Sequence, residues 1–379
     1  MAQRARVAEV RAQALEVAAG WSPPDAPGSW RLTAALFSLI AGHERLLLRL
    51  ARLPADRLPA LLGSAAICYL VRRDQPDPLS RYFPEAGRPQ PPLDRDFGPA
   101  AERFIESRLD DIMTLCGQHR YQMNEVARCA QIATGMAATA ADQTPVAVVD
   151  LGTGAGLGLR LDHYQYDIGG RLAGPAGAEV RLRCALRGDR RPPPAVVPPI
   201  AARAGIELNP VDLADPAALA WLEACTPPEA AALTRLAAAV EVARKNPAAV
   251  VAGDVVDELP GVLAGLPAGL PVVVVDAYLA VFLPPARLTR LREIMAAAAG
   301  TRPVTWLSLD PLIPLGPAGR DSVQGLALPA ALVREYSETG VFAVLGAQTF
   351  DGSSSRPAAD EGRLLARAHP SGQWLEWIG

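Results

Sequence analysis

Residues 146–156 read VAVVDLGTGAG, an apolar run that ends in an aspartate and three glycines at alternate positions. An uninterrupted apolar run of this length is typical of a strand that is buried on both faces of a sheet. Glycines directly after such a strand let the backbone turn tightly and approach a ligand closely. The stretch therefore predicts the first strand of a parallel α/β sheet, with a ligand site where the strand ends.

Similar apolar runs recur downstream, and segments with helical periodicity separate them. The further expected strands are residues 206–213, 248–254, 271–277 and 303–310, followed by 340–350, 362–370 and 372–379. Strands that alternate with helices imply βαβ units and a mostly parallel sheet, whereas the last three segments are joined by turns and predict an antiparallel end. Between the first two strands, residues 164–170 and 179–188 are expected to form an inserted hairpin.

The first 144 residues have apolar positions at helical spacing instead. Helices are expected over residues 1–20, 31–53, 58–71, 97–118 and 124–141. The predicted fold class is therefore α/β: an all-helical N-terminal region, residues 1–144, precedes a doubly wound, mostly parallel sheet with antiparallel C-terminal strands. This second domain covers residues 145–379, with the hairpin inserted around 164–188.

Composition disfavours several function classes. The 37 basic and 40 acidic residues give a net charge of −3, and aromatic residues make up only 5%, which argues against nucleic-acid binding. Lys245 is the one lysine, so Schiff-base chemistry is not expected and an anion site would be built from arginines. No apolar stretch is long enough to span a membrane, and the N-terminus lacks the apolar core of a secretory signal.

The cysteines and histidines suggest no metal site. The five cysteines show no paired spacing, and the four histidines are scattered, so neither zinc binding nor a disulfide framework is expected. We read the cysteines as small buried hydrophobic residues of a protein in the reducing cytoplasm.

The spacing D-x-G-x-G-x-G after the first strand resembles the first motif of S-adenosylmethionine-dependent methyltransferases. It differs from the dinucleotide pattern G-x-G-x-x-G. By position, Glu207 on the second expected strand would bind the cofactor ribose. Asp254, at the end of the third, would lie near the adenine. The resemblance thus implies cofactor binding by Asp150, Gly152, Gly154, Gly156, Glu207 and Asp254. Asp276, at the end of the fourth strand, is a catalytic candidate. The alternative for the glycine loop is that its glycines only allow the chain to cross to the next strand and bind no ligand.

Several short segments, in order, resemble the actinobacterial family catalogued as domain of unknown function 2332. They are Arg120, Gln122–Glu125 and Arg128; Gly156-Leu157, Asp162 and Tyr164; Arg183–Gly188; Arg203, Gly205, Asn209-Pro210 and Asp212; Gly253-Asp254; Trp306; Leu365-Ala366; and His369-Pro370, Gly372 and Trp374. The resemblance runs from about residue 30 to the C-terminus. It implies a helical part fused to a methyltransferase-like domain.

The chain departs from that family at Met123, along the glycine loop from Gly152 to Leu159, and at Ser371, where a second histidine is usual. The altered glycine loop looks more like that of a true methyltransferase. The loss of a polar side chain at Gly158 and of the histidine favours altered chemistry. We therefore hypothesise a specialised paralogue of secondary metabolism.

A dense group of polar residues lies between two predicted helices: Arg120, Gln122, Asn124, Glu125 and Arg128. Asn124 is expected to cap the next helix with Glu125 in its first turn, and Arg128, four residues on, would share its face. We expect this face to line the active cleft. There Arg120, Gln122, Asn124 and Arg128 would bind an anionic substrate group, and Glu125 would act in catalysis.

Asp162 and Tyr164 follow the glycine loop and flank His163. A histidine has a suitable pKa for a general base, but one at a helix end more often lies on the surface. Asp162 and Tyr164, which match the family resemblance, are the stronger catalytic candidates.

Three functions remain open. The first is S-adenosylmethionine-dependent methyl transfer to a small anionic substrate. The second needs no cofactor: an amine deprotonated by Glu125, Asp162 or Asp254 attacks a neighbouring carbon while arginines stabilise a departing sulfate or phosphate, as in aziridine formation. The third is a degenerate methyltransferase domain whose helical region scaffolds a protein partner, which could be a second subunit or a carrier protein.

Overall fold

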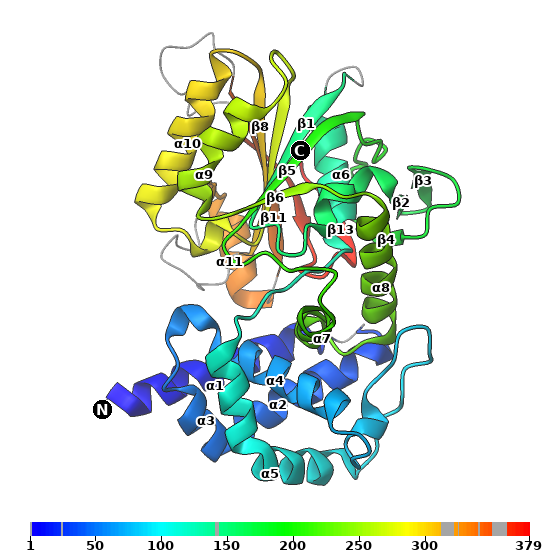
Figure 1. Cartoon of the computed structure of the whole chain (residues 1–379), viewed down its shortest axis with the longest axis vertical. Coiled ribbons are helices and arrows are strands. Elements are labelled where there is room, and N and C mark those ends of the chain that lie inside the picture. Colours follow the sequence, from blue (N-terminus) through cyan, green and yellow to red (C-terminus); the bar gives the residue numbers. More distant parts are fainter. Residues whose placement is uncertain are drawn as a thin grey trace. The chain divides into compact units, whose positions relative to one another are not determined.

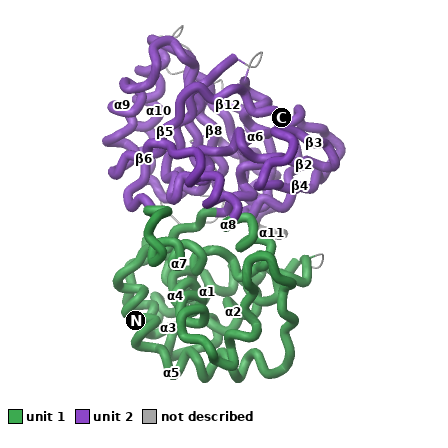
Figure 2. Tube along the Cα trace, turned by 45° about the vertical axis from the view of Figure 1, so that its right-hand side comes forward, with its two compact units in different colours: residues 1–124, 212–237 green, residues 125–211, 238–379 purple. Residues whose placement is uncertain are grey.

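The computed structural model describes residues 2–23, 26–140, 144–311, 322–324, 326–339, 342–350 and 362–379. The chain divides into two compact units (Figure 2): unit 1 holds residues 1–124 and 212–237, and unit 2 holds residues 125–211 and 238–379. Sequence alone places the boundary after residue 144, whereas helix α6 (Arg128–Thr139) belongs to unit 2 with the sheet that it covers.

Unit 1 is helical. Its helices are α1 (Ala2–Gly20), α2 (Arg31–Gly42), α3 (Glu44–Leu50), α4 (Pro59–Arg73), α5 (Phe97–Gln118), α7 (Pro216–Cys225) and the first part of α8 (Ala230–Lys245). The helix expected over residues 31–53 is interrupted at His43, whose imidazole accepts the Leu46 N–H at 3.2 Å and begins α3. One apolar core joins α1 to α5 and α7, and Trp221 of α7 is part of it.

Unit 2 is built on a large sheet. Its strands are β1 (Val146–Leu151), β2 (Gln165–Ile168), β3 (Arg171–Ala173), β4 (Arg181–Arg187), β5 (Ile200–Glu207), β6 (Ala249–Ala252), β7 (Val272–Ala277), β8 (Val304–Pro311), β11 (Ala343–Phe350), β12 (Gly362–Ala368) and β13 (Trp374–Trp377). They lie in the order β3-β2-β4-β13-β12-β11-β8-β7-β1-β5-β6. Strands β6, β5, β1, β7 and β8 are parallel, and the C-terminal strands β11, β12 and β13 are antiparallel, as expected. They do not end the sheet, because β13 also pairs in parallel with β4, beyond which lie β2 and β3. A short ribbon of β9 (Ser322–Val323) and β10 (Leu326–Ala327) precedes α11 (Ala330–Thr339).

Two segments differ from the sequence prediction. The second parallel strand, β5, begins at residue 200 and ends at Glu207 instead of covering 206–213. A hairpin does form within 164–188, but it joins β2 to the short β3 through Gly169-Gly170, and β4 pairs with β2 in parallel. The predicted hairpin between the two long segments is therefore wrong in its pairing, because the turn closes much earlier than the alternating pattern suggested.

Helices cover both faces of the parallel part of the sheet (Figure 1). Helices α9 (Val255–Gly265) and α10 (Pro285–Ala299) share a core with Trp306 and Phe350 on one face. Helix α6 lies on the other face, where Gly135 allows close packing: a Cβ there would lie 3.2 Å from Leu345. Within the described residues, no helix has the length and apolar character needed to cross a membrane.

Candidate functional site

Three parallel strands bring acidic residues to one edge of the sheet. Leu151 of β1 pairs with Asp276 of β7, which pairs with Ser308 of β8, so the strands end almost level. Asp150, Asp276 and Asp310 are each the second-to-last residue of their strand. The carboxyl ends of parallel strands are where open α/β sheets bind ligands. We refer to these three residues as the strand-end acids.

The glycine loop after β1 adopts the tight backbone turn that its sequence predicts. Gly152, Gly154 and Gly156 have φ angles of 68°, 59° and 67°, in the left-handed region that favours glycine. The loop turns back on the acid that precedes it, because the Thr153 hydroxyl donates a 2.6 Å hydrogen bond to Oδ2 of Asp150. One carboxylate oxygen of Asp150 is thereby held in place.

The carboxyl of Asp150 holds its proton more tightly than an exposed aspartate does. Burial is the main cause that raises its pKa from 3.8 to about 7; the charges of Asp276 and Glu207 act in the same direction, and the hydrogen bond from Thr153 acts against it. A Cβ on Gly158 would lie only 3.0 Å from Oδ2, so a glycine there leaves room beside the carboxyl. A carboxyl that titrates near neutrality suits general acid–base chemistry.

Asp276 and Asp310 form a second acidic group, away from solvent. Asp276 is fully buried: its Oδ2 accepts the indole N–H of Trp306 at 2.7 Å, and its Oδ1 lies 3.2 Å from the Ser308 hydroxyl. The same hydroxyl lies 2.7 Å from Oδ2 of Asp310. Burial raises the pKa of Asp276 to about 6 and that of Asp310 well above its usual range. Two carboxyls in such an arrangement cannot both ionise easily, so the pair retains a proton.

The strand-end acids have no cation paired directly with them. In the part of the chain that the structure describes, no basic side chain forms an ion pair with Asp150, Asp276 or Asp310. Backbone N–H groups are the substitute: those of Ala280 and Val281 lie 3.3 and 3.2 Å from carboxylate oxygens of Asp276 and Asp310. A buried acid without a counter-charge opposes folding, and groups of this kind concentrate at functional sites.

The acids predicted to hold a cofactor are engaged by the protein itself. Glu207, at the end of β5, accepts the Gly154 N–H at 2.9 Å through one oxygen and the Asn209 N–H at 3.0 Å through the other. Asp254 follows β6, caps the N-terminus of α9 and forms an ion pair with Arg287. A cofactor would have to share both carboxylates with these partners.

Side chains also occupy space beside the loop glycines. A Cβ on Gly152 would lie 3.3 Å from Leu279, and one on Gly156 would lie 2.9 Å from the Arg160 guanidinium. Arg160 is buried, and its Nε donates to the carbonyl of Asn246 at 2.9 Å. A loop of this kind approaches a cofactor through its bare glycines. Because protein atoms lie against two of them, less of the loop is left to contact S-adenosylmethionine.

Asp162 and Tyr164, predicted to be catalytic, have structural partners at the 3-10 helix η4 (Leu157–His163). Both carboxylate oxygens of Asp162 accept from Arg203 at 2.8 Å. Tyr164 is fully buried, and its hydroxyl donates to the Leu157 carbonyl at 2.8 Å. These contacts fix the turn between the glycine loop and β2.

The polar group before α6 is divided between the two units: Arg120, Gln122 and Asn124 belong to unit 1, and Glu125 and Arg128 to unit 2. The Arg120 side chain is exposed, while Gln122 and Asn124 are partly buried. Nδ2 of Asn124 lies 3.4 Å from the Gln122 carbonyl. Each subset is therefore considered within its own unit.

The expected capping of α6 by Asn124 is wrong. The helix begins at Arg128, with Ala127 in the N-cap position. Glu125 contributes instead, because its Oε1 accepts the Ala127 N–H at 3.0 Å. A carboxylate at a helix N-terminus is favourable. Since Asn124 precedes the helix, it does not share a helical face with Arg128.

Arg128 is buried at the start of α6. Its Nε donates to the Pro370 carbonyl at 2.7 Å, and its guanidinium carbon lies 3.7 Å from the centre of the Tyr278 ring. Gln131, less than one turn further on, donates to the His369 carbonyl at 3.0 Å. The start of α6 is thus tied to the turn before β13, and the cation is held over the residue that follows β7.

Sequence reasoning missed Tyr278, Ser308 and Asp310. The available signal for Asp310 was the aspartate that recurs near the ends of three buried strands. Tyr278 has a φ of 70°, rare for a residue other than glycine. Its hydroxyl is buried and has no hydrogen-bond partner among the described residues. A conformation of this kind leaves no recognisable pattern in a single sequence.

The described cysteines and acids show no other reactive centre. All five cysteines are buried and unpaired, and burial raises the pKa of each thiol. Among the described residues, no three His, Cys, Asp or Glu side chains are arranged to hold a metal ion.

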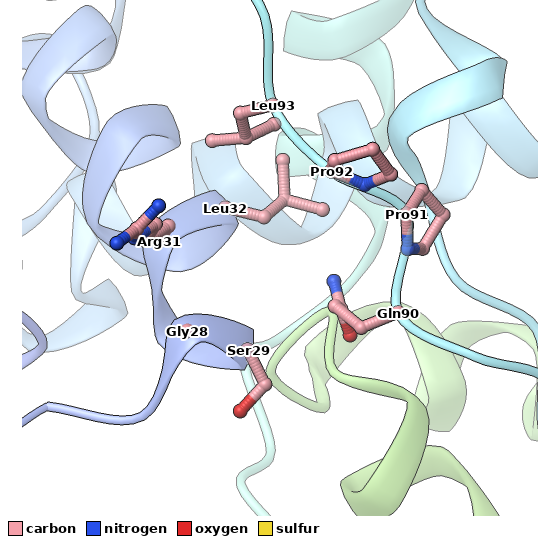
Figure 3. Close-up of a pocket in the computed structure, with 8 residues that line it drawn as sticks. All are labelled: Gly28, Ser29, Arg31, Leu32, Gln90, Pro91, Pro92 and Leu93. Atoms are coloured by element: carbon pink, nitrogen blue, oxygen red, sulfur yellow. The ribbon is translucent and has the colours of Figure 1, made fainter.

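Unit 1 contains a pocket of about 240 Å³ (Figure 3). Its lining residues are Gly28, Ser29, Arg31, Leu32, Gln90, Pro91, Pro92 and Leu93. The sole charged side chain among them is that of Arg31, and no acid is present. The pocket therefore lacks a proton-transfer group of its own.

The fold and the site define an α/β protein with an acidic centre at the carboxyl ends of its parallel strands. A family model described as "Uncharacterized protein conserved in bacteria (DUF2332)" matches residues 11–377. The chain belongs to this family, which confirms the resemblance found in the sequence motifs. No curated protein matches the chain.

Proposed function

We propose that the protein is an enzyme that acts on a small molecule by proton transfer at the strand-end acids, without a cofactor. The observation that supports it best is that three acids, two of them buried and one partly buried, meet at the carboxyl edge of the sheet with no ion-pair partner among the described residues. Asp150 is the general base, because it is partly exposed and its pKa is raised to about 7. Asp276 and Asp310 are 0% and 3% exposed, which leaves them in a supporting role.

The reaction class we propose is an intramolecular displacement. Asp150 takes a proton from an amine of the substrate, and the nitrogen forms a bond to a neighbouring carbon. The carbon–oxygen bond at that carbon breaks, and sulfate or phosphate leaves with the electron pair. Arg128, held between Pro370 and Tyr278, supplies a fixed positive charge for the departing anion. Small nitrogen heterocycles of secondary metabolism would be products of this chemistry.

The other acids named as bases are less suited to the role. Asp162 is paired with Arg203 and Asp254 with Arg287, so each carboxylate already has an arginine partner. Glu125 is buried and already accepts the Ala127 N–H. Asp150, which has no ion-pair partner among the described residues and lies at the end of β1, is therefore the preferred general base.

The test uses 2-aminoethyl hydrogen sulfate as the probe and follows sulfate release by ion chromatography. We expect release above the buffer rate, rising with pH through about 7 as Asp150 ionises. Asp150→Asn should lower release by about 100-fold or more, the contribution of a general base. Asp254→Asn is the matched control and should stay within about threefold. Wild-type release equal to the buffer rate, or an unchanged Asp150→Asn rate, would contradict the proposal.

Methyl transfer from S-adenosylmethionine is the second candidate. It is favoured by the three left-handed glycines after β1 and by Glu207 beside them, since each carboxylate oxygen can accept a further hydrogen bond. The strand order β6-β5-β1-β7-β8, with the glycine loop after the central β1, is that of a doubly wound sheet, which also supports this candidate.

Calorimetry separates the two candidates. Under the cofactor-independent proposal, titration with S-adenosylmethionine up to millimolar concentration gives no saturable heat. Saturable binding that Gly154→Val abolishes would favour methyl transfer, because a side chain at φ 59° both strains the loop and fills its approach to a ligand.

A further inference from the structure

One face of the sheet in unit 2 carries arginines instead of a helix. Strand β4 alternates in burial: Leu182 and Cys184 are buried, and Arg181 and Arg183 between them are exposed. Helix α6 packs against β4 and β2. Among the described helices, no other makes extensive contact with these strands. The opposite face of β3, β2 and β4 is therefore open to a partner.

Three exposed arginines of β4 point to this face, Arg181, Arg183 and Arg187, and two more exposed arginines follow the strand, Arg190 and Arg191. Between residues 171 and 191 the acids are Glu179 and Asp189 alone, and Glu179 forms an ion pair with Lys245. Arg183 pairs with Asp167 yet keeps 87% of its side chain exposed. Within the described residues, Arg181 forms no ion pair or side-chain hydrogen bond. We call this set the arginine face.

Apolar side chains lie among the charges. Leu172 of β3 is 71% exposed, and the sheet register aligns it with Asp167 and Arg183. Trp374 of β13 is partly exposed, pairs with Ala185 of β4, and carries the guanidinium of Arg187 4.3 Å from its ring centre. Arginine and tryptophan are enriched at protein–protein interfaces.

We propose that the arginine face docks an acidic amphipathic helix of a partner protein. Alternate residues of a strand lie about 6.7 Å apart, and helix residues four apart rise about 6 Å, so the two arginines on β4 match glutamates at positions i and i+4. Each guanidinium can bind a carboxylate through two parallel hydrogen bonds. An apolar residue on the same side of the helix would meet Leu172. A single-stranded nucleic acid is a poorer match because Arg187 already covers the Trp374 ring.

The experiment measures the fluorescence anisotropy of three labelled probes on the full chain. The first is a 20-residue helical peptide with glutamates at i, i+4 spacing beside a leucine stripe. The second has the same composition with the glutamates scattered around the helix. The third is a single-stranded oligodeoxynucleotide of equal charge. We expect the first peptide to bind at least tenfold tighter than either of the others, and its affinity to fall as salt rises.

Charge reversal on β4 provides the decisive variant. Arg181→Glu/Arg183→Glu should weaken binding of the first peptide by at least tenfold, and Leu172→Ser by about threefold. The matched control, Arg88→Glu/Arg95→Glu, reverses two arginines of unit 1 that are 72% and 96% exposed, and it should change the affinity by less than twofold.

Thermal melting of each variant separates lost docking from lost folding. Charge-neutral Arg181→Gln/Arg183→Gln serves as the second variant, with an intermediate loss of affinity expected. Equal binding of the two peptides, equal effects of the two charge reversals, or preferential binding of the oligonucleotide would overturn the proposal.

Discussion

Unit 2 holds its acids in two contrasting ways. Asp162 and Asp254 each form an ion pair with an arginine and keep some exposure to water. The strand-end acids Asp150, Asp276 and Asp310 have only hydroxyl, indole and backbone partners, and burial raises the pKa of each. The first arrangement ties each acid to another part of the fold and serves structure. The second opposes the charged form, and it is this opposition that makes a proton available near neutral pH.

The largest expected effect is a pH dependence of stability that comes from Asp150. Its pKa is 3.8 when exposed and about 7 in the folded chain, so between these values the folded state holds a proton that the unfolded state has released. Its contribution to stability is therefore present below pH 4 and is lost as the pH rises towards 7. A shift of about three pKa units corresponds to roughly 4 kcal/mol, reduced to about 3 by partial exposure.

Urea unfolding of the wild type and Asp150→Asn between pH 4 and 8 measures this contribution. The variant should lose the part of the pH slope that belongs to Asp150. The control, Asp254→Asn, removes an acid with an arginine partner and should retain that slope. If the unfolding free energy of the wild type and of Asp150→Asn depends on pH in the same way, Asp150 does not have the raised pKa that distinguishes the strand-end acids from the arginine-paired acids.

Breaking the ion pair of Asp162 should have the next largest effect. Arg203→Ala leaves a carboxylate with 24% exposure without its partner, and we expect a loss of about 2 kcal/mol of unfolding free energy. A double-mutant cycle with Asp162→Ala isolates the pair, and the two losses should not add. Additive losses would mean that Asp162 is not held by this arginine.

Tyr278→Phe should raise stability slightly. The tyrosine hydroxyl is buried with no hydrogen-bond partner among the described residues, so its removal should gain about 0.5–1 kcal/mol. The ring remains under Arg128, and Tyr278→Leu, which removes that stacking, is the comparison. A clear loss of stability in Tyr278→Phe would reveal a partner for the hydroxyl.

Arg287→Ala should have the smallest effect. Arg287 and Asp254 are each 37% exposed, and ion pairs of this kind contribute less than about 1 kcal/mol. Chemical denaturation at low salt should show the difference, and high salt should remove most of it. A loss of more than about 2 kcal/mol of unfolding free energy would mean that this ion pair contributes as much as a buried one.

The parallel strands and the glycine loop could be predicted because their signals are local. An apolar run such as residues 271–277 identifies its own strand, and alternate glycines identify a turn. The position of Asp150 at the end of β1 followed directly from this pattern.

The roles of the acids could not be predicted because they depend on distant partners. Asp162 is separated by 41 residues from Arg203, and Asp254 by 33 from Arg287. The parallel pairing of β2 with β4 and the start of α6 at Arg128 likewise depend on contacts across the sheet. A single sequence shows which residues are acidic, and only the fold shows which of them lack a cation.

The most direct test of the account is the pKa of Asp150 itself. Carbon-13 NMR of aspartate side-chain carboxyls, with Asp150→Asn to assign the signal, follows its ionisation in the folded protein. The account predicts a transition near pH 7. A transition near pH 4, as in an exposed or ion-paired aspartate, would contradict the proposal that the strand-end acids form a proton-transfer centre.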